Sequence, residues 1–118
     1  KEMLLKISSS LGGGFGRQRL ICGAINSGGL ILGGYLNNGK EESKEDQYKI
    51  IKEFTDKFNE LNNTIICGEL LKNVKNLTQG IKPQQRNEEY YKLRPCAKFV
   101  VDAIEIIINI INNNTVNI

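Results

Sequence analysis

The chain has 118 residues, of which 40% are hydrophobic and 25% are charged. This length and composition predict one globular domain over residues 1–118 and exclude an intrinsically disordered chain. The formal net charge is only +3, from 16 Lys and Arg against 13 Asp and Glu, so no nucleic-acid partner is expected. Histidine is absent, which excludes Ser-His and Cys-His nucleophile pairs and histidine-ligated metal sites.

The three cysteines, Cys22, Cys67 and Cys96, are far apart in the sequence and form no C-x-x-C pair. Their spacing excludes thioredoxin-like motifs and zinc knuckles. An odd number of cysteines also cannot all close into disulfides within one chain. No secretory signal is recognisable in the first residues, so we expect a reducing, cytoplasmic compartment.

The first third of the chain combines a short element, a loop and an uncharged segment. Residues 2–7 are too few to decide between the end of a helix and a short strand, and residues 8–16 form a glycine-rich loop. Residues 20–36 carry no charge and mix small with apolar residues, which predicts a helix buried on all sides. This segment is barely long enough to cross a bilayer and has Asn26 and Ser27 near its middle, so no membrane span is expected.

The middle of the chain carries the clearest helical pattern. Asn37-Asn38-Gly39 predicts a left-handed cap, and Ser43 followed by Asp46 predicts the N-cap and weak capping box of the next helix. Asn62-Asn63 ends this helix. Apolar residues recur along it at spacings of three and four, at Ile51, Phe54, Phe58 and Leu61.

The last third is predicted to hold two helices. Residues 64–72 indicate an extended entry and a short helix that begins near Cys67, and residues 73–89 indicate a loop. The last helix opens at Arg94-Pro95 and ends near Ile111. It is so apolar that it is either mostly buried or shared with a second subunit in a homodimer. The predicted fold class is therefore all-α, a small helical bundle with a glycine-rich loop before a buried helix of small residues.

Each cysteine lies at the predicted start of a helix. Cys22 follows the glycine-rich loop, Cys67 precedes a short apolar turn, and Cys96 follows Pro95. The N-terminus of a helix offers free backbone N–H groups and a partial positive charge, both of which favour an anion. We therefore expect the pKa of each thiol to be lowered, and the resulting thiolate is the form that attacks disulfides and binds metals.

Two further considerations weigh on this interpretation. Arg17 and Arg19 lie close to Cys22 in the sequence, and Arg94 lies close to Cys96, so their charges would lower the pKa values of these thiols further. Against a functional role, a free cysteine is often buried as a small, inert hydrophobic residue. The position of all three cysteines at predicted helix starts favours a functional role over inert burial.

The glycine-rich loop lies immediately before Cys22. A G-x-G sequence before a helix can receive a phosphate, but the dinucleotide fingerprint needs a preceding strand and a further glycine, where this chain has Arg17. We expect instead a backbone that closely approaches a thiolate, a cluster or another helix, with its N–H groups turned inward as an anion-binding nest. The candidate cofactor-binding residues are therefore Gly12, Gly13, Gly14, Gly16 and Gly23.

Taken together, the glycine-rich loop, Cys22-Gly23-Ala24, Cys67 and Arg94-Pro95-Cys96 resemble a known family. It is the family of redox-active proteins named for the pattern C…CGAxxG…C…C, also written C_GCAxxG_C_C. Members are similar in having a G-G-G-[FI]-G loop before the second cysteine, and a third cysteine after a helix with a phenylalanine face. A fourth cysteine follows a proline that begins the last helix. The resemblance implies that Phe54 and Phe58 form that face and that Cys67 and Cys96 are the third and fourth cysteines.

The resemblance runs from about Leu11 to Glu105 and departs from the pattern at two places. The glycine of the pattern falls at Ser27, with Gly28 one place later. The first cysteine of the pattern has no counterpart and would lie on a helix upstream of Lys1, so we expect the native chain to continue beyond this N-terminus. The resemblance implies thiol-based redox activity without identifying a substrate.

Three functions remain open at this point. In the first, Cys22 or Cys67 attacks as a thiolate in thiol–disulfide exchange with a redox protein or a small thiol, and another of the three cysteines resolves the mixed disulfide. In the second, Cys22, Cys67 and Cys96 are ligands of an iron–sulfur or other metal cluster, with an upstream cysteine or a water completing the set. In the third, the chain is a helical interaction module with inert cysteines.

Overall fold

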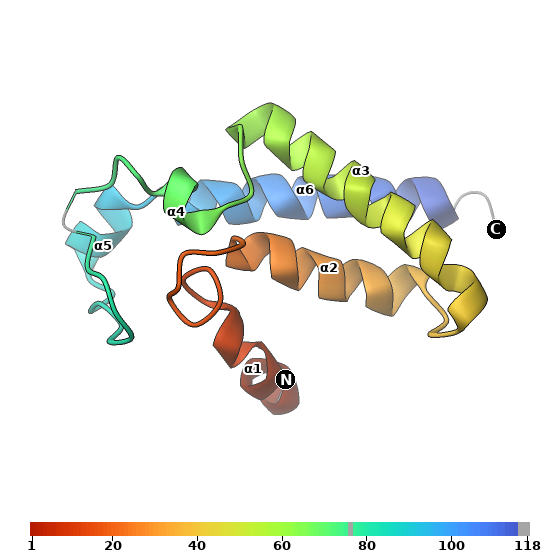
Figure 1. Ribbon diagram of the computed structural model, residues 1–118, viewed down its shortest axis with the longest axis horizontal. Coiled ribbons are helices and arrows are strands. Elements are labelled where there is room, and N and C mark those ends of the chain that lie inside the picture. The colour runs from red at the N-terminus through yellow and green to blue at the C-terminus, as the bar shows by residue number, and fades with distance from the viewer. Residues whose placement is uncertain (76, 116–118) are drawn as a thin grey trace.

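The computed structural model describes residues 1–75 and 77–115, which form helices joined by loops (Figure 1). No β-strand occurs in this described part of the chain, where Ile21 and Ile66 form only an isolated antiparallel bridge. The predicted all-α fold class is confirmed. The elements are, in order, α1 (Glu2–Ser8), η1 (Ser9–Leu11), α2 (Gly23–Leu36), η2 (Glu41–Ser43), α3 (Lys44–Asn62), α4 (Cys67–Leu70), α5 (Glu88–Leu93) and α6 (Cys96–Thr115), where η marks a 3-10 helix.

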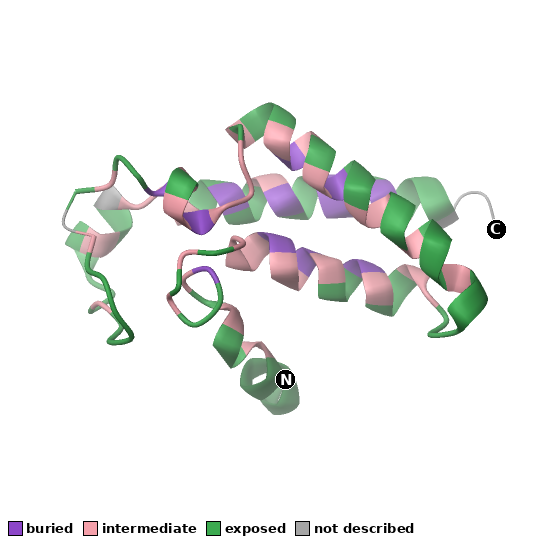
Figure 2. Ribbon diagram, in the orientation of Figure 1, coloured by how far each residue is buried: buried purple, intermediate pink, exposed green. Residues whose placement is uncertain are grey.

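Helices α2, α3 and α6 pack together as the body of the molecule (Figure 1). The α2 and α6 helices begin at the same end of this body, at the left of Figure 1, and α3 runs in the opposite direction. Their facing sides form one hydrophobic core, drawn purple in Figure 2. Burial of a large apolar side chain contributes about 1.5–3 kcal/mol, so this core is the main source of stability. Its most deeply buried large side chains are Leu32, Phe54, Phe58, Leu71 and Ile110.

The α2 helix lies so close to α3 at Gly28 that no side chain fits there. A Cβ atom added to Gly28 would lie 2.5 Å from the ring of Phe54 and 3.0 Å from the side chain of Ile107. Ser27, where the family pattern places its glycine, is only partly buried. The glycine that the packing requires is therefore Gly28, and the helix packing survives the shift of one residue.

The prediction that residues 20–36 form a helix buried on all sides is wrong. The α2 helix begins only at Gly23, and one of its sides faces away from the core. Helices α3 and α6 both pack against the side that carries Ile25, Gly28 and Leu32, which leaves the opposite side uncovered. Among the described residues, no helix combines the length and the apolar character needed to cross a lipid bilayer. The exposed apolar residues of α2 are Leu30, Ile31 and Tyr35, at 61%, 44% and 72%.

The α6 helix is also two-sided. It extends beyond the predicted end near Ile111, because the asparagines at 112–114 continue it to Thr115. One side, with Phe99, Ala103 and Ile110, is buried in the core. The other side exposes the apolar residues Val100, Val101, Ile104 and Ile108. This exposed side is the surface through which a homodimer was expected, and the homodimer stays a prediction.

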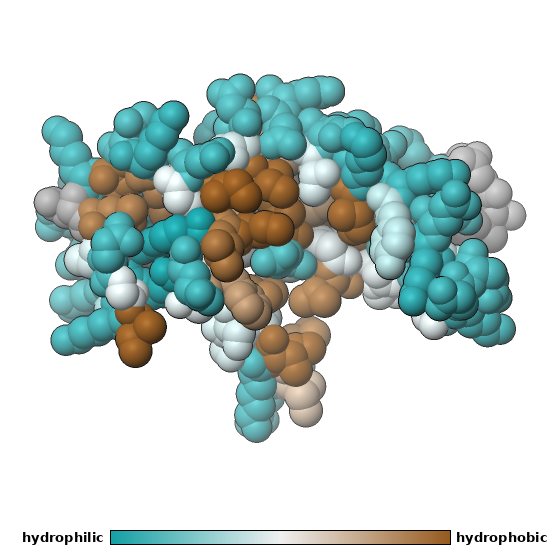
Figure 3. Space-filling model, viewed as in Figure 1, coloured by the Kyte–Doolittle hydropathy of each residue, from teal (hydrophilic) through white to brown (hydrophobic). Residues whose placement is uncertain are grey.

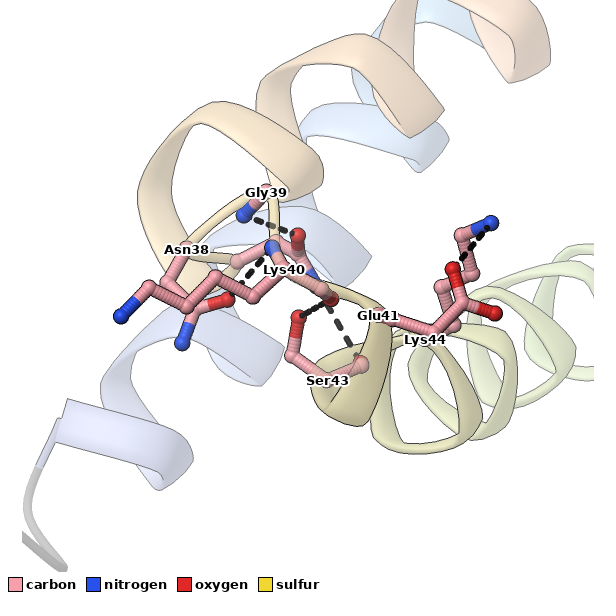
Figure 4. A network of polar contacts seen from close by, with 7 residues as sticks. Asn38, Gly39, Lys40, Glu41, Ser43 and Lys44 are labelled. Atoms are coloured by element: carbon pink, nitrogen blue, oxygen red, sulfur yellow. Dashed lines mark hydrogen bonds and ion pairs between the residues drawn. The ribbon is translucent and has the colours of Figure 1, made fainter.

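Polar contacts with the backbone hold the turn between α2 and α3 (Figure 4). The side chain of Asn37 accepts a hydrogen bond of 2.7 Å from the N–H of Gly39, whose φ is +77°. The cap of α2 is Asn37 itself, in an extended conformation, so the left-handed residue lies in the turn and not at the predicted helix cap. The hydroxyl of Ser43 donates to the carbonyl of Lys40 at 2.7 Å and accepts nothing from α3. The predicted capping box with Asp46 is therefore wrong, because the 3-10 turn η2 already precedes the helix.

Two short helices lie outside the body. The α1 helix projects from it (Figure 1), and its apolar residues are seen at the lower edge of Figure 3. The α5 helix was not predicted, although Asn87 is a favourable N-cap, and its side chain accepts a 3.0 Å hydrogen bond from the N–H of Tyr90. The exposed apolar residues of α1 are Met3, Leu4, Leu5 and Ile7.

Candidate functional site

The three cysteines lie at one end of the helical body, and each is at a helix start. Cys22 is the N-cap of α2, whereas Cys67 and Cys96 are the first residues of α4 and α6. These three helices begin near one another at the left of the body in Figure 1. All three thiols are free, with Cys67 buried and the other two partly buried. The predicted position at helix starts is confirmed for all three, and we call this end of the molecule the cysteine end.

Backbone hydrogen bonds hold the segment before α2 alongside the segment before α4. The N–H of Cys22 donates to the carbonyl of Ile65 at 2.8 Å, and the N–H of Cys67 donates to the carbonyl of Leu20 at 2.5 Å. The isolated antiparallel bridge lies between these two bonds. Residues that are 45 positions apart in the sequence are thereby held next to each other.

Burial and the neighbouring thiols raise the pKa of Cys22. Burial is the main cause, because it removes water from the charged form, and thiolates at Cys67 and Cys96 raise the pKa further. The backbone N–H groups of Ala24 and Ile25 at the start of α2 act in the opposite direction, but they do not outweigh burial. The predicted lowering of the pKa is therefore wrong for Cys22, although the helix start contributes as expected.

The same balance applies to Cys96. Burial raises its pKa, the nearby guanidinium of Arg94 lowers it, and a thiolate at Cys67 raises it again. The predicted lowering is wrong here too, because the loss of water outweighs the arginine. Since Cys67 acts on both of the other thiols, the three cysteines lie within the range of electrostatic interaction.

The glycine-rich loop is a left-handed coil. Every residue from Gly13 to Arg17 has φ between +62° and +72°, and Arg19 has φ +62°. For a non-glycine residue such a conformation costs about 1–2 kcal/mol. Phe15, Arg17 and Arg19 all adopt it, so the surrounding contacts must hold the loop in place.

The backbone N–H groups of the coil form hydrogen bonds within the coil and the turn before it. Those of residues 15–20 all donate to carbonyls within residues 10–15, for example Gly16 to Ser10 at 2.8 Å and Leu20 to Gly14 at 2.9 Å. The N–H groups of residues 15–20 are therefore not available to bind an anion, and an anion-binding nest in this loop stays a prediction. Arginine side chains add positive charge beside Cys67 and Cys96.

Gly14 is the loop residue that meets a cysteine. It is buried, its φ is +72°, and a Cβ atom added to it would lie 2.6 Å from the Cβ atom of Cys67. Gly23 packs against the carbonyl oxygen of Leu11, at 3.1 Å from its added Cβ position. The close backbone approach that the sequence predicted is therefore found at Gly14 and Gly23.

The other predicted glycines lie elsewhere. Gly13 faces Arg17 within the coil, whereas added Cβ atoms at Gly12 and Gly16 would meet almost nothing. Of these two, only Gly16 has a positive φ. A cofactor-binding role for the five glycines stays a prediction.

Two arginines of the coil connect the cysteine end to the loop before α5. The guanidinium of Arg17 donates to the carbonyls of Thr78, at 3.1 Å, and of Gly80, at 3.0 Å, and also to the carbonyl of Lys82. The guanidinium of Arg19 donates to the carbonyl of Thr78 at 3.2 Å and lies 3.9 Å from the Sγ atom of Cys67. The prediction that Arg17 and Arg19 lower the pKa of Cys22 is wrong, because no arginine is among the causes of its shift. Arg19 lies beside Cys67 instead. That both arginines fasten this loop was not predicted.

Two residues near α5, Arg86 and Tyr90, were missed as candidates, whereas Arg94 was named for its position beside Cys96. Arg86, Tyr90 and Arg94 are spaced four apart in the sequence, and both guanidinium groups lie over the ring of Tyr90, at 5.7 and 4.4 Å. A cation over an aromatic ring is attracted by the negative face of the ring. The spacing of four was the available signal, but the polar composition of residues 73–89 concealed it.

A cluster requires ligands that converge on one point. Among residues 1–75 and 77–115, no three Cys, Asp or Glu side chains form a group that could hold a metal ion. The cysteines, as placed here, do not provide a ready ligand set for the iron–sulfur alternative, and no step through a cluster is derived.

The fold and the site define a class, namely small all-α proteins with three thiols gathered at helix starts. The family described as "Putative redox-active protein (C_GCAxxG_C_C)" matches residues 1–110, and the chain belongs to this family. No curated protein and no solved structure matches the chain. The resemblance found in the sequence is thereby confirmed.

Proposed function

We propose that the protein carries out thiol–disulfide exchange with Cys22, Cys67 and Cys96. The observation that carries this proposal is the gathering of three free thiols at one end of the molecule, each at the start of a helix. Inert cysteines would have no reason to lie within range of one another's charges or beside Arg19 and Arg94.

The reaction moves two electrons in two steps. A thiolate sulfur of the protein attacks one sulfur of a substrate disulfide, which forms a mixed disulfide and releases the first substrate thiolate. A second protein thiol then loses its proton and attacks the protein sulfur of the mixed disulfide. This step forms an intramolecular disulfide and releases the second substrate thiolate. The substrate gains two electrons and two protons, and the protein dithiol loses them.

Burial separates the roles of the cysteines. Cys22 and Cys96 are partly exposed and can meet a substrate, whereas Cys67 is only 7% exposed. Cys67 interacts electrostatically with both of the other thiols and contacts Gly14. We therefore assign the attack to Cys22 or Cys96 and the resolving step to Cys67.

The test is oxidation of the anaerobically purified protein with a mild disulfide, followed by thiol titration and peptide mapping. We expect two of the three thiols to be lost in an intramolecular disulfide that contains Cys67, and to be recovered with dithiothreitol. The variant Cys67→Ser should stop at the mixed disulfide. Retention of all three thiols under these conditions would overturn the proposal.

The iron content of the same anaerobic preparation provides a second readout. A brown protein with stoichiometric iron would replace the proposal with the cluster alternative. Colourless, iron-free protein whose thiols are lost and recovered supports the exchange reaction.

A further inference from the structure

A cavity of about 410 Å³ adjoins the cysteine end. It lies between the left-handed coil and the segment that leads into α5 and α6. Four of the residues that line it are the arginines Arg17, Arg19, Arg86 and Arg94, and none is Asp or Glu. We call this cavity the arginine pocket. Its volume falls within the usual range for sites that bind small molecules, about 300–1,000 Å³.

In the described part of the chain, no ion pair joins any of the four arginines to a carboxylate. The ion pairs found there join Lys44 to Glu41, Lys52 to Asp56 and Lys98 to Asp102. The guanidinium of Arg94 binds the neutral side chain of Gln84, and those of Arg86 and Arg94 lie over a tyrosine ring. Bringing like charges together without a counter-charge costs free energy, which an anionic ligand would recover.

The lowered pKa of Arg17 also indicates positive charge that is not balanced by a nearby anion. Burial lowers the pKa of its guanidinium, and the charges of Arg19 and Arg94 lower it further. The Nε atom of Arg19 is buried and has no hydrogen-bond partner among the described residues. The arginines therefore repel one another, and one of their donors is unused.

The pocket is preformed. The bonds from Arg17 to the carbonyls of residues 78–82 fix one wall, and the ring of Tyr90 positions the two guanidinium groups on the other. Guanidinium groups that are held in place lose little conformational entropy when they bind a carboxylate in the two-pronged manner typical of arginine.

We propose that the arginine pocket binds the carboxylate groups of a small anionic disulfide, which is the substrate of the neighbouring thiols. This inference rests on the proposed function. Arg19 both lines the pocket and reaches the Sγ atom of Cys67, and Arg94 lies two residues before Cys96. A ligand held by its carboxylates would therefore have its sulfur atoms near the thiols, and the exchange then follows the two steps given above.

The first experiment compares three disulfides of different charge. Reduced protein is mixed with dithiodiglycolate, which is anionic, with 2-hydroxyethyl disulfide, which is neutral, or with cystamine, which is cationic, and each rate is divided by that of free 2-mercaptoethanol. We expect the normalised rate to be highest for dithiodiglycolate, and this preference to weaken as salt is added.

Arg86→Gln is the test variant, because this side chain is exposed and its contact among the described residues is the ring of Tyr90, not a hydrogen bond between elements. The preference for the anionic over the neutral disulfide should fall about tenfold, since a hydrogen bond to a charged group is lost. Arg86→Lys should restore part of it. The control Lys49→Gln removes the same charge from an exposed position on α3 and should leave the preference unchanged.

The second experiment separates binding from chemistry. Adipate has the shape of dithiodiglycolate but contains no disulfide, so calorimetry with adipate tests the pocket alone. Binding of adipate but not of 1,6-hexanediol, weakened by Arg86→Gln, supports the pocket as a carboxylate site. If no thiol then reacts with any disulfide, the proposed function fails while the carboxylate site stands. Thiols that react equally with all three disulfides, together with no binding of adipate, would overturn the inference and leave the proposed function intact.

Discussion

The body of the molecule and its cysteine end are held together in different ways. In the body, apolar side chains that recur every three or four residues interdigitate, and the backbone is ordinary helix. At the cysteine end, a left-handed coil, six internal N–H bonds and the guanidinium of Arg17 fix the chain. The comparison shows that side-chain burial sets the architecture, whereas backbone strain and polar bonds position the thiols.

Gly14→Ala is expected to break the cysteine end with the largest effect. A Cβ atom at φ +72° is strained, and it would also lie 2.6 Å from both Cys67 and the nitrogen of Leu20, at a cost of about 2–5 kcal/mol. Alkylation of the buried Cys67 should accelerate on the order of 100-fold as this end opens. Gly12→Ala, at a position with open space, is the control. Equal alkylation rates in the two variants would contradict this account.

Gly28→Ala tests the close packing of α2 against α3 in the body. Alanine normally favours a helix by about 1 kcal/mol over glycine, but here its Cβ atom would lie 2.5 Å from the Phe54 ring. We expect a net loss of about 1–3 kcal/mol in urea unfolding. At Gly34, where nothing lies within 4 Å, the same substitution should stabilise α2. A more stable Gly28→Ala protein would show that α2 and α3 are less tightly packed than described.

The pH dependence of Cys22 alkylation tests whether burial or the helix start controls the pKa of this thiol at the cysteine end. In the variant Cys67→Ser/Cys96→Ser, burial should still hold the pKa of Cys22 above the ordinary thiol value of 9.0. The thiolate is then the minor form at pH 7, so the rate of alkylation should rise about tenfold per pH unit, or 1.4 kcal/mol, and continue to rise beyond pH 9. A free peptide that contains Cys22 should level off sooner. A plateau below pH 8 would mean that the helix start outweighs burial.

The smallest effect is expected at the polar contact between α3 and α6. The carboxylate of Asp102 accepts hydrogen bonds from Lys98, at 2.9 Å, and from Asn62, at 3.2 Å, and the bond from Lys98 is the main reason that its pKa is lowered. Lys98→Met should cost about 0.3–0.5 kcal/mol at pH 7. Because the pKa is lowered on folding, this contribution is lost as the pH falls below 3.8.

Lys52→Met is the matched control for this last prediction. It removes an i,i+4 pair of similar length whose carboxylate is more exposed, so its cost should be smaller. A cost of Lys98→Met that is unchanged at pH 2 would contradict the assignment to the charge of Asp102.

The sequence was informative where periodicity governs the structure. The spacing of Phe54 and Phe58 predicted the buried side of α3, and Pro95 predicted the start of α6. Leu61 follows the same spacing but is 58% exposed, because at this last turn of α3 it is Asn62 that faces α6, where its side chain binds Asp102. The position of the cysteines at helix starts could also be predicted, since glycine, proline and turn residues mark those starts.

The left-handed coil, the pKa shifts and the arginine pocket could not be predicted, because they depend on contacts between segments that are distant in the sequence. No propensity indicates that Phe15, Arg17 and Arg19 adopt left-handed backbone, because only the surrounding bonds make that conformation favourable. The direction of the pKa shift at Cys22 depends on how much water the neighbouring segments exclude. The arginine pocket likewise requires residues from the coil and from the segment before α6, which the sequence separates by about two thirds of its length.

The parallel course of α2 and α6 has a further consequence. Their N-terminal ends point to the arginines, whereas the far end of the molecule carries the acidic start of α3, with Glu45 and Asp46 in its first turn. The peptide dipoles of α2 and α6 point the same way along the 47 Å axis, and the antiparallel α3, with 19 residues, opposes them only in part. We therefore expect a negatively charged solute to be turned toward the cysteine end before it touches the surface, and this steering to fade as ions are added to the solution.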